Sequence, residues 1–149
     1  MTDLLQHVAD TLDIQRVLNR VSLYTDEKRW DEHQTLFADE VMIDFGGVQP
    51  TQTIAAAALR AWSAASYARV KTLHLVTNQD IRIAGDAAEV TSYGRALHER
   101  TDTGERWDIY CCYEHRLTRT DTGWKITRLK MEPVRQTGND RLLAEAAGN

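Results

Sequence analysis

Residues 105–126, ERWDIYCCYEHRLTRTDTGWKI, combine a long run of β-forming residues, a tight turn and the start of a second run. The run at 105–119 is rich in Tyr, Trp, Ile and Thr, and Asp-Thr-Gly at 121–123 is typical of a hairpin turn. The remaining strand-like runs are 70–83, 88–99 and 124–133, and turn sequences separate them. The second half of the chain is therefore predicted to be an antiparallel meander of four strands.

The first half of the chain carries mostly helical patterns. A buried stripe at three-and-four spacing predicts a long helix over residues 2–25; its members are Ile14, Val17, Leu18, Val21 and Tyr24. The other expected elements are a short helix at 31–37, a strand at 41–45, an alanine-rich helix at 53–65, and a short helix or frayed end at 140–147. Helices followed by an antiparallel meander predict an α+β fold, in which a strongly curved sheet can leave a pocket beneath the helices.

The composition is that of an ordinary globular protein. The 18 basic and 22 acidic residues give a formal net charge of −4, and no basic block suggests nucleic acid. No apolar run approaches the ~18 residues of a membrane span, and the first residues lack the basic and then apolar order of a signal peptide. We therefore expect one cytoplasmic domain over residues 1–149, with neither nucleic acid nor membrane as a partner.

The cysteines are adjacent, Cys111 and Cys112, within the strand expected at 105–119. Because neighbouring side chains of a strand point to opposite faces, no disulfide is expected between them. No metal-ligand spacing accompanies them, so reduced thiols and no metal site are expected.

Asp26 and His74 are the first candidates for chemistry. Asp26 ends the first helix near Trp30, and His74 lies inside the strand expected at 70–83. A carboxylate behind an imidazole makes a general base, because the acid fixes the ring's tautomer and supports the cation formed on proton uptake. Taken alone, Asp26 can equally be a polar residue at a helix end, and His74 a hydrogen-bonded structural histidine.

The two following strands add further polar candidates. His98 ends the run 88–99 on a face of small side chains, which can line a cavity or underlie a packed helix. In the run 105–119, alternation places these residues on one face: Trp107, Ile109, Cys111, Tyr113 and His115. Tyr113 and His115 can donate hydrogen bonds to a substrate oxygen, although ordinary core packing explains both at least as well.

Several of these segments resemble scytalone dehydratase and its relatives in the SnoaL-like group of the nuclear transport factor 2-like superfamily. YTDEKRWD (24–31) is similar to the family's aspartate four residues before a tryptophan, KTLH (71–74) to its catalytic histidine segment, and SYGRALHER (92–100) to the strand of its second histidine. DTGWKI (121–126) resembles the group's last hairpin. The resemblance implies a cone-shaped α+β barrel, with a strongly curved, mostly antiparallel sheet and N-terminal helices that enclose a pocket. It places the catalytic residues at Asp26, His74 and His98.

The chain also departs from this family. The dehydratase polarises its substrate carbonyl with two tyrosines, whose matching positions here are Thr25 and Phe45. Tyr24 is a neighbouring phenol that can substitute if the helix end changes. The arginine of the related hexachlorocyclohexane dehydrochlorinase aligns with Leu129, and Arg128, one residue away, should point to the other face. The expected substrate-binding residues are Tyr24, Trp30, Phe45, Cys111, Tyr113 and Arg128.

The sequence thus predicts a cofactor-independent lyase, dehydratase-like, or an isomerase that acts on a small hydrophobic ring compound. His74, held by Asp26, is expected to remove a proton next to a carbonyl. His98, or a tyrosine such as Tyr24 or Tyr113, is expected to stabilise the oxyanion or protonate a leaving hydroxyl.

A noncatalytic role is the alternative: a ligand-binding module, or a structural subunit like the small subunits of ring-hydroxylating dioxygenases. In that case Asp26 and His74 form a structural pair, and the strand face around Tyr110, Glu114 and Arg116 binds a partner chain. By analogy with the family, a homo-oligomer, either a dimer or a trimer, is expected in either case.

Overall fold

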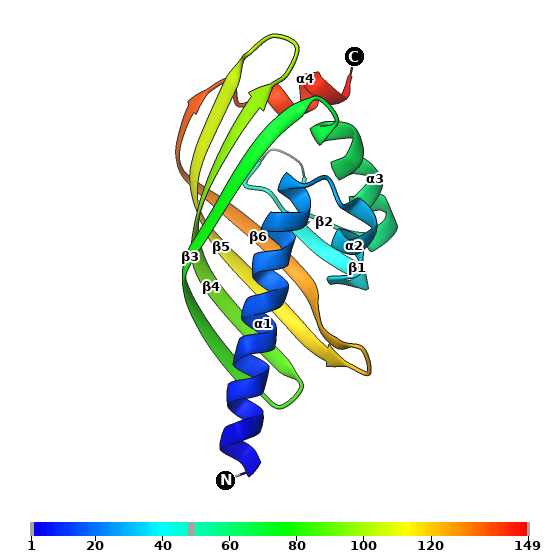
Figure 1. The fold of residues 1–149 in the computed structure, drawn as a ribbon, viewed down its shortest axis with the longest axis vertical. Coiled ribbons are helices and arrows are strands. Elements are labelled where there is room, and N and C mark those ends of the chain that lie inside the picture. Colours follow the sequence, from blue (N-terminus) through cyan, green and yellow to red (C-terminus); the bar gives the residue numbers. More distant parts are fainter. Residues whose placement is uncertain (1, 48–49, 149) are drawn as a thin grey trace.

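The computed structural model describes residues 2–47 and 50–148, which form helices wrapped by one long, curved sheet (Figure 1). In chain order the elements are α1 (Thr2–Asp26), α2 (Trp30–Gln34), β1 (Phe37–Asp44), β2 (Gln52–Ala55), α3 (Ala56–Tyr67), β3 (Val70–Ala84), β4 (Ala87–Arg100), β5 (Arg106–Thr120), β6 (Gly123–Gly138) and α4 (Leu142–Ala147). None of the helices in these ranges is both long and apolar enough to cross a bilayer.

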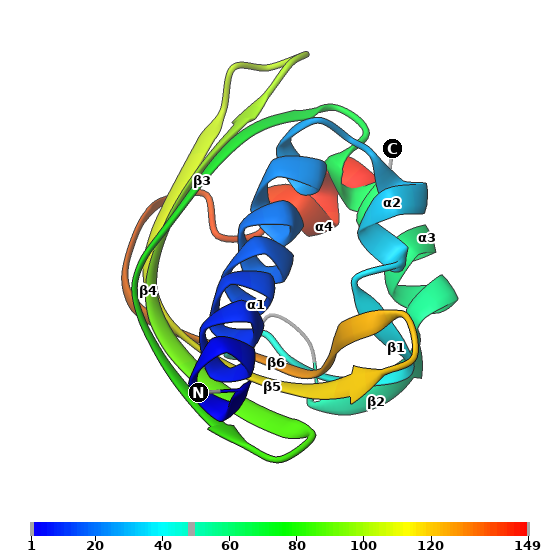
Figure 2. The ribbon, with the colours of Figure 1, turned by 60° about the horizontal axis from the view of Figure 1, so that its bottom comes forward.

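The six strands lie in the order β2-β1-β6-β5-β4-β3. The pairs of the meander β3 to β6 and the pair β1–β2 are antiparallel, whereas β1 and β6 are parallel. Shifts of register occur between Thr77 and Asp80 and at two places along β5 and β6, and such bulges bend and twist a sheet. The sheet therefore coils around α1, as Figure 2 shows, and remains open at its β2 and β3 edges.

The core is divided into two clusters. One cluster joins α1 to β1 and β6, with Ile14, Val41 and Ile126 fully buried. The other joins β5 to α4, with Ile109 and Leu142 at its centre. Partly buried Phe45 packs against both clusters, and the space between them is where the cavity described below lies.

These observations confirm the predicted α+β class, with N-terminal helices and a strongly curved, mostly antiparallel sheet. The four predicted strands of the meander are all present, although β6 continues past Pro133 because a register shift accommodates this residue opposite Cys111. The sheet is not closed into a barrel. The two thiols are free, as expected.

The helix predicted over residues 53–65 is wrong at its start. Residues Gln52–Ala55 form β2, which pairs with β1 through contacts such as Val41 with Ile54, and the helix α3 then runs to Tyr67. Pairing with a distant strand overrides the helical propensity of alanine here, which a local pattern cannot reveal. The later helix end matters, because it carries Tyr67 to the cavity.

Candidate active site

Asp26 and His74 contact each other directly. The Asp26 carboxylate Oδ1 lies 2.6 Å from His74 Nδ1, and its Oδ2 accepts a hydrogen bond of 2.9 Å from the backbone N–H of His74. The hydroxyl of Thr72 donates to Oδ1 at 2.7 Å. These contacts hold the carboxylate between one backbone and two side-chain partners on a single strand.

Local structure accounts for this arrangement. Helix α1 ends at Asp26, and Lys28 then adopts a left-handed conformation, with φ of 59°, as the chain turns away. In β3, side chains two residues apart share a face, so that Thr72 and His74 both point towards the end of α1. The Asp26 side chain thus reaches β3 at the point where the backbone N–H of His74 is also free to donate.

The Asp26 carboxyl is ionised despite its surroundings. Burial opposes the charged form, but the hydrogen bonds from the His74 ring, the His74 backbone and Thr72 outweigh burial and lower its pKa below the ordinary 3.8. A carboxylate can only accept hydrogen bonds, so His74 Nδ1 carries a proton. In the neutral ring Nε2 therefore holds the lone pair, and it has no partner among the described residues.

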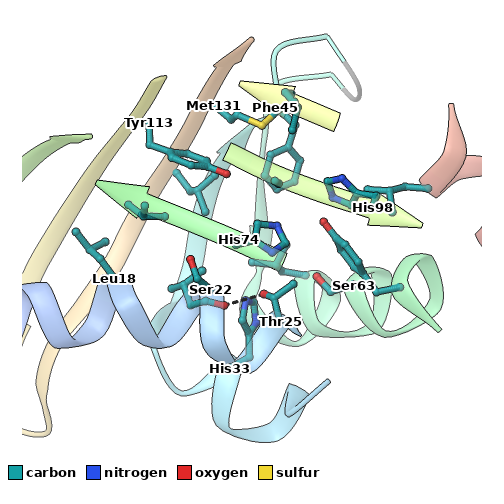
Figure 3. A pocket seen from close by; sticks show the side chains of 18 of the residues that line it. Leu18, Ser22, Thr25, His33, Phe45, Ser63, His74, His98, Tyr113 and Met131 are labelled. Carbon is teal, nitrogen blue, oxygen red and sulfur yellow. Dashed lines mark hydrogen bonds between the residues drawn. The ribbon is translucent and has the colours of Figure 1, made fainter. Parts of the chain in front are cut away.

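The His74 ring forms part of the wall of a cavity of about 110 Å³ between the sheet and the helices (Figure 3). The wall is mainly apolar, with Leu18, Phe45 and Met131 among its members. The polar side chains that reach it are Ser22, Thr25, His33, Ser63, Tyr67, His74, His98, Tyr113 and His115. Such a lining can hold a small hydrophobic ring while a few polar groups orient it.

His98 also lines the cavity, and its tautomer is fixed. Its Nδ1 lies 3.0 Å from the backbone carbonyl oxygen of Trp107, and its ring stacks on the Trp107 ring at 4.5 Å. A carbonyl oxygen only accepts, so Nδ1 must be the protonated nitrogen. Burial, together with the nearby His74, lowers the pKa of His98 from 6.5 to about 4, and the ring is neutral near pH 7.

Two phenols reach the same cavity. Tyr67, at the end of α3, lies with its ring 6.5 Å from the His74 ring and 6.0 Å from the His98 ring, and burial raises its pKa. Tyr113, on β5, is partly buried, and burial and the neighbouring Cys111 thiol raise its pKa well above 10.0. Both phenols are therefore protonated near neutral pH, as hydrogen-bond donors must be.

Two further histidines are buried in the wall. Burial lowers the pKa of His33 and of His115 from 6.5 to about 4, and the Nδ1 atom of each is enclosed without a hydrogen-bond partner. His115 was a candidate from strand alternation. His33 and Tyr67 were missed: the spacing of His33 from Trp30 on a short helix was its only sign, and the predicted end of the alanine-rich helix stopped before Tyr67.

Of the residues predicted from the sequence, the structure brings together Asp26, His74, His98, Phe45 and Tyr113. Thr25 and Phe45, the positions that match the two tyrosines of the dehydratase, both line the cavity. Four other expected substrate-binding residues lie elsewhere; they are Tyr24, Trp30, Cys111 and Arg128.

The placement of these four side chains has physical reasons. Tyr24 packs beneath the Arg29 guanidinium, 4.5 Å from it, and Trp30 lies behind the wall against His33 and Tyr67. Cys111 is covered, with its Sγ 3.7 Å from the carbonyl oxygen of Gly94. None of these three side chains lines the cavity.

Arg128 points to the outer face of the sheet, as its register relative to Leu129 requires. Its Nη1 lies 3.7 Å from Glu114, while Leu129 lines the cavity. Arg128 therefore does not line this cavity. No group of three or more His, Cys, Asp or Glu side chains suited to a metal ion occurs within residues 2–47 and 50–148.

Comparison with known proteins gives a family match over most of the chain. The family described as SnoaL-like domain matches residues 6–130. The Kfla4162 protein of Kribbella flavida is 24% identical, with a TM-score of 0.85, covering 93% of this chain and 99% of its own.

Two further structures carry names that suggest chemistry. A candidate scytalone dehydratase of Novosphingobium aromaticivorans is 20% identical, with a TM-score of 0.82, over 93% of this chain and 92% of its own. The hexachlorocyclohexane dehydrochlorinase LinA-type3 of Novosphingobium barchaimii is 17% identical, with a TM-score of 0.76, and the match covers 91% of this chain and 94% of its own. These matches confirm the resemblance inferred from the sequence; at such identities the solved structures establish the fold and no activity.

Proposed function

Because this chain belongs to the family of SnoaL-like domains, we propose that it is a cofactor-independent lyase or isomerase acting on a small hydrophobic ring compound. One observation carries the proposal: the Asp26 carboxylate is hydrogen-bonded at 2.6 Å to His74, whose ring lines an apolar cavity. This is the arrangement that a general base needs, because the carboxylate fixes the tautomer and stabilises the imidazolium formed on proton uptake.

In the proposed reaction, His74 Nε2 removes a proton from the carbon next to a carbonyl. The electrons of the broken C–H bond move into an enolate, and Asp26 stays ionised beside the new imidazolium. In a dehydration, the C–O bond on the next carbon then breaks and the leaving hydroxyl takes the proton from His74 as water. In an isomerisation, the same proton returns to another carbon of the ring. The apolar wall strengthens these charge interactions by excluding water.

The size of the cavity limits the substrate. An engineered protein cavity of about 150 Å³ holds benzene, so a cavity of about 110 Å³ suits a single small ring. Several structural neighbours are named for eliminations, as a scytalone dehydratase and a hexachlorocyclohexane dehydrochlorinase. Both names fit the removal of a proton and a leaving group from a compound of modest size, which supports the lyase reading of this site.

The test uses a β-hydroxycyclohexanone, a single-ring ketone that yields cyclohexenone when water is lost. We expect the protein to speed the appearance of the enone absorbance, and His74→Gln to lower the rate by about 10²–10⁴-fold, the usual contribution of a positioned base. His7→Gln, at an exposed position on α1, is the matched control and should leave the rate unchanged. Equal rates for the wild type and His74→Gln contradict the assignment of His74.

A further inference from the structure

The two imidazoles that line the cavity at its Asp26 end both present hydrogen-bond acceptors. His74 donates its Nδ1–H to the Asp26 carboxylate, and His98 donates its Nδ1–H to the Trp107 carbonyl oxygen. In each neutral ring the remaining nitrogen, Nε2, then carries only a lone pair. Neither Nε2 has a partner among the described residues. His98 therefore cannot donate a hydrogen bond to a developing oxyanion, which was one of the roles expected for it from the sequence.

A hydrogen-bond donor at this end of the cavity is the phenol of Tyr67. The rings of Tyr67, His74 and His98 come from three different elements and lie 5.6 to 6.5 Å apart, so they surround one point. The Tyr67 hydroxyl has no hydrogen-bond partner among the described residues, although the side chain lines the cavity. Lys28 Nζ lies 5.3 Å from the Tyr67 ring centre and adds a positive charge on that side.

We propose that Tyr67 donates a hydrogen bond to the carbonyl oxygen of the substrate, and that His98 accepts one from a hydroxyl group of the same molecule. The preferred ligands are then single-ring ketones that carry a hydroxyl group. The reaction at His74 rests on the proposed function, whereas this recognition pattern stands on the contacts of Tyr67 and His98.

The pattern has a chemical consequence for an elimination. The His74 and His98 rings lie 5.6 Å apart at nearly a right angle and both line the cavity. In the proposed elimination the leaving hydroxyl contacts both rings. A hydroxyl that donates its hydrogen to His98 keeps the lone pairs of its oxygen for the proton that His74 has removed. The departing water retains its original O–H bond and gains one from His74. His98 acts in this step by orienting the leaving group.

The test measures the dissociation constants of three probes by calorimetry: cyclohexanone, β-hydroxycyclohexanone and β-methoxycyclohexanone. Every protein carries His74→Gln, which is expected to slow conversion of the probes by about 10²–10⁴-fold during the measurement. A failure of the proposed chemistry then does not affect the result. The hydroxy compound should bind more tightly than the other two, because only it can donate to His98, by the three- to tenfold that about one net hydrogen bond contributes.

Two additional substitutions separate the two contacts. Tyr67→Phe should weaken all three probes alike, by about three- to tenfold, because all carry the carbonyl. His98→Phe keeps an aromatic ring beside Trp107 and should remove the preference for the hydroxyl group without weakening cyclohexanone. Tyr110→Phe, on the outer face of β5, is the control and should change nothing.

The outcomes are distinct. Methoxy and hydroxy probes of equal affinity in the His74→Gln protein overturn the role of His98, and this comparison holds even if His98→Phe does not fold. Unchanged affinity for cyclohexanone in Tyr67→Phe overturns the role of Tyr67. If the three probes show the expected affinities but the wild type converts none of them, the binding proposal stands and the proposed catalysis is overturned.

Discussion

At the level of single residues, the pairing of Asp26 with His74 could be predicted from the sequence, whereas the contacts around the pair could not. A carboxylate at a helix end and a histidine among apolar strand residues are visible in the sequence, as is the family segment around each. The partner of His98 is a backbone carbonyl, and no sequence pattern specifies which carbonyl an imidazole meets. Arg128 shows the opposite case, since strand alternation alone places it outside the cavity.

Replacing Asp26 tests whether its charge supports the His74 base. Asp26→Asn removes the charge that supports the His74 imidazolium, so we expect turnover of β-hydroxycyclohexanone to fall about 10²-fold or more. The variant should also be less stable at neutral pH, since the ionised carboxylate accepts three hydrogen bonds. Asp13→Asn, at an exposed site on α1, is the matched control for both measurements.

The sign of the pH effect follows from the lowered pKa of Asp26. Its contribution to the free energy of unfolding is complete above the ordinary 3.8 and is lost as the pH falls through the lower folded value. Urea unfolding at several pH values should therefore show a gap between wild type and Asp26→Asn that narrows only in acid. A gap that widens as the pH falls contradicts this ionisation state.

At the scale of elements, β4 makes room for the cavity with its small side chains. Gly94 pairs with Cys111 in the β4–β5 register, and the ring of the diagonal neighbour Tyr113 lies over it. A Cβ atom added at Gly94 would lie 2.2 Å from Tyr113 Cε2. The sequence showed the row of small residues but left open whether a helix or a cavity covers it. The ring of Tyr113 covers Gly94 itself, and the cavity lies beside Ala96 and His98. Whether a helix or a cavity covers this row depends on the curvature of the sheet, which arises from contacts between distant strands.

Gly94→Ala is therefore expected to displace the Tyr113 ring and to destabilise the protein by about 1–3 kcal/mol, the usual cost of overpacking. Chemical denaturation measures this loss. In a Tyr113→Leu background the same substitution should cost less, because the contacts with the ring at 2.2 and 2.9 Å are gone and the contact with Cys111 Sγ at 2.9 Å remains. Equal costs in the two backgrounds contradict the assignment of the clash to Tyr113.

At the scale of the whole molecule, a cavity between two core clusters holds several neutral histidines away from water. Burial lowers the pKa of His33, His98 and His115 to about 4, whereas each titrates near 6.5 when exposed. The fold class, the meander and the first helix followed from the sequence. The division of the core and the burial of three histidines did not, because both depend on how the sheet closes over the helices.

The buried histidines predict how stability depends on pH. Below about pH 6.5 these histidines are protonated in the unfolded chain but stay neutral in the folded chain. The free energy of unfolding should therefore fall as the pH drops from 6.5 towards 5. His115→Phe should reduce this slope by about one third, because it removes one of three such groups. His7→Gln, at an exposed position, should leave the slope unchanged; the same slope in His115→Phe contradicts the burial of a neutral His115.

Every form of the proposed reaction begins with the removal of a proton by His74, and solvent exchange tests this removal without any leaving group. The measurement is the rate at which cyclohexanone dissolved in D₂O takes up deuterium next to its carbonyl, followed by proton NMR. With the wild type we expect exchange faster than in buffer, and with His74→Gln a loss of about 10²–10⁴-fold of that catalysed rate. A wild-type rate equal to that of buffer, or an unchanged rate in His74→Gln, would contradict proton removal by His74.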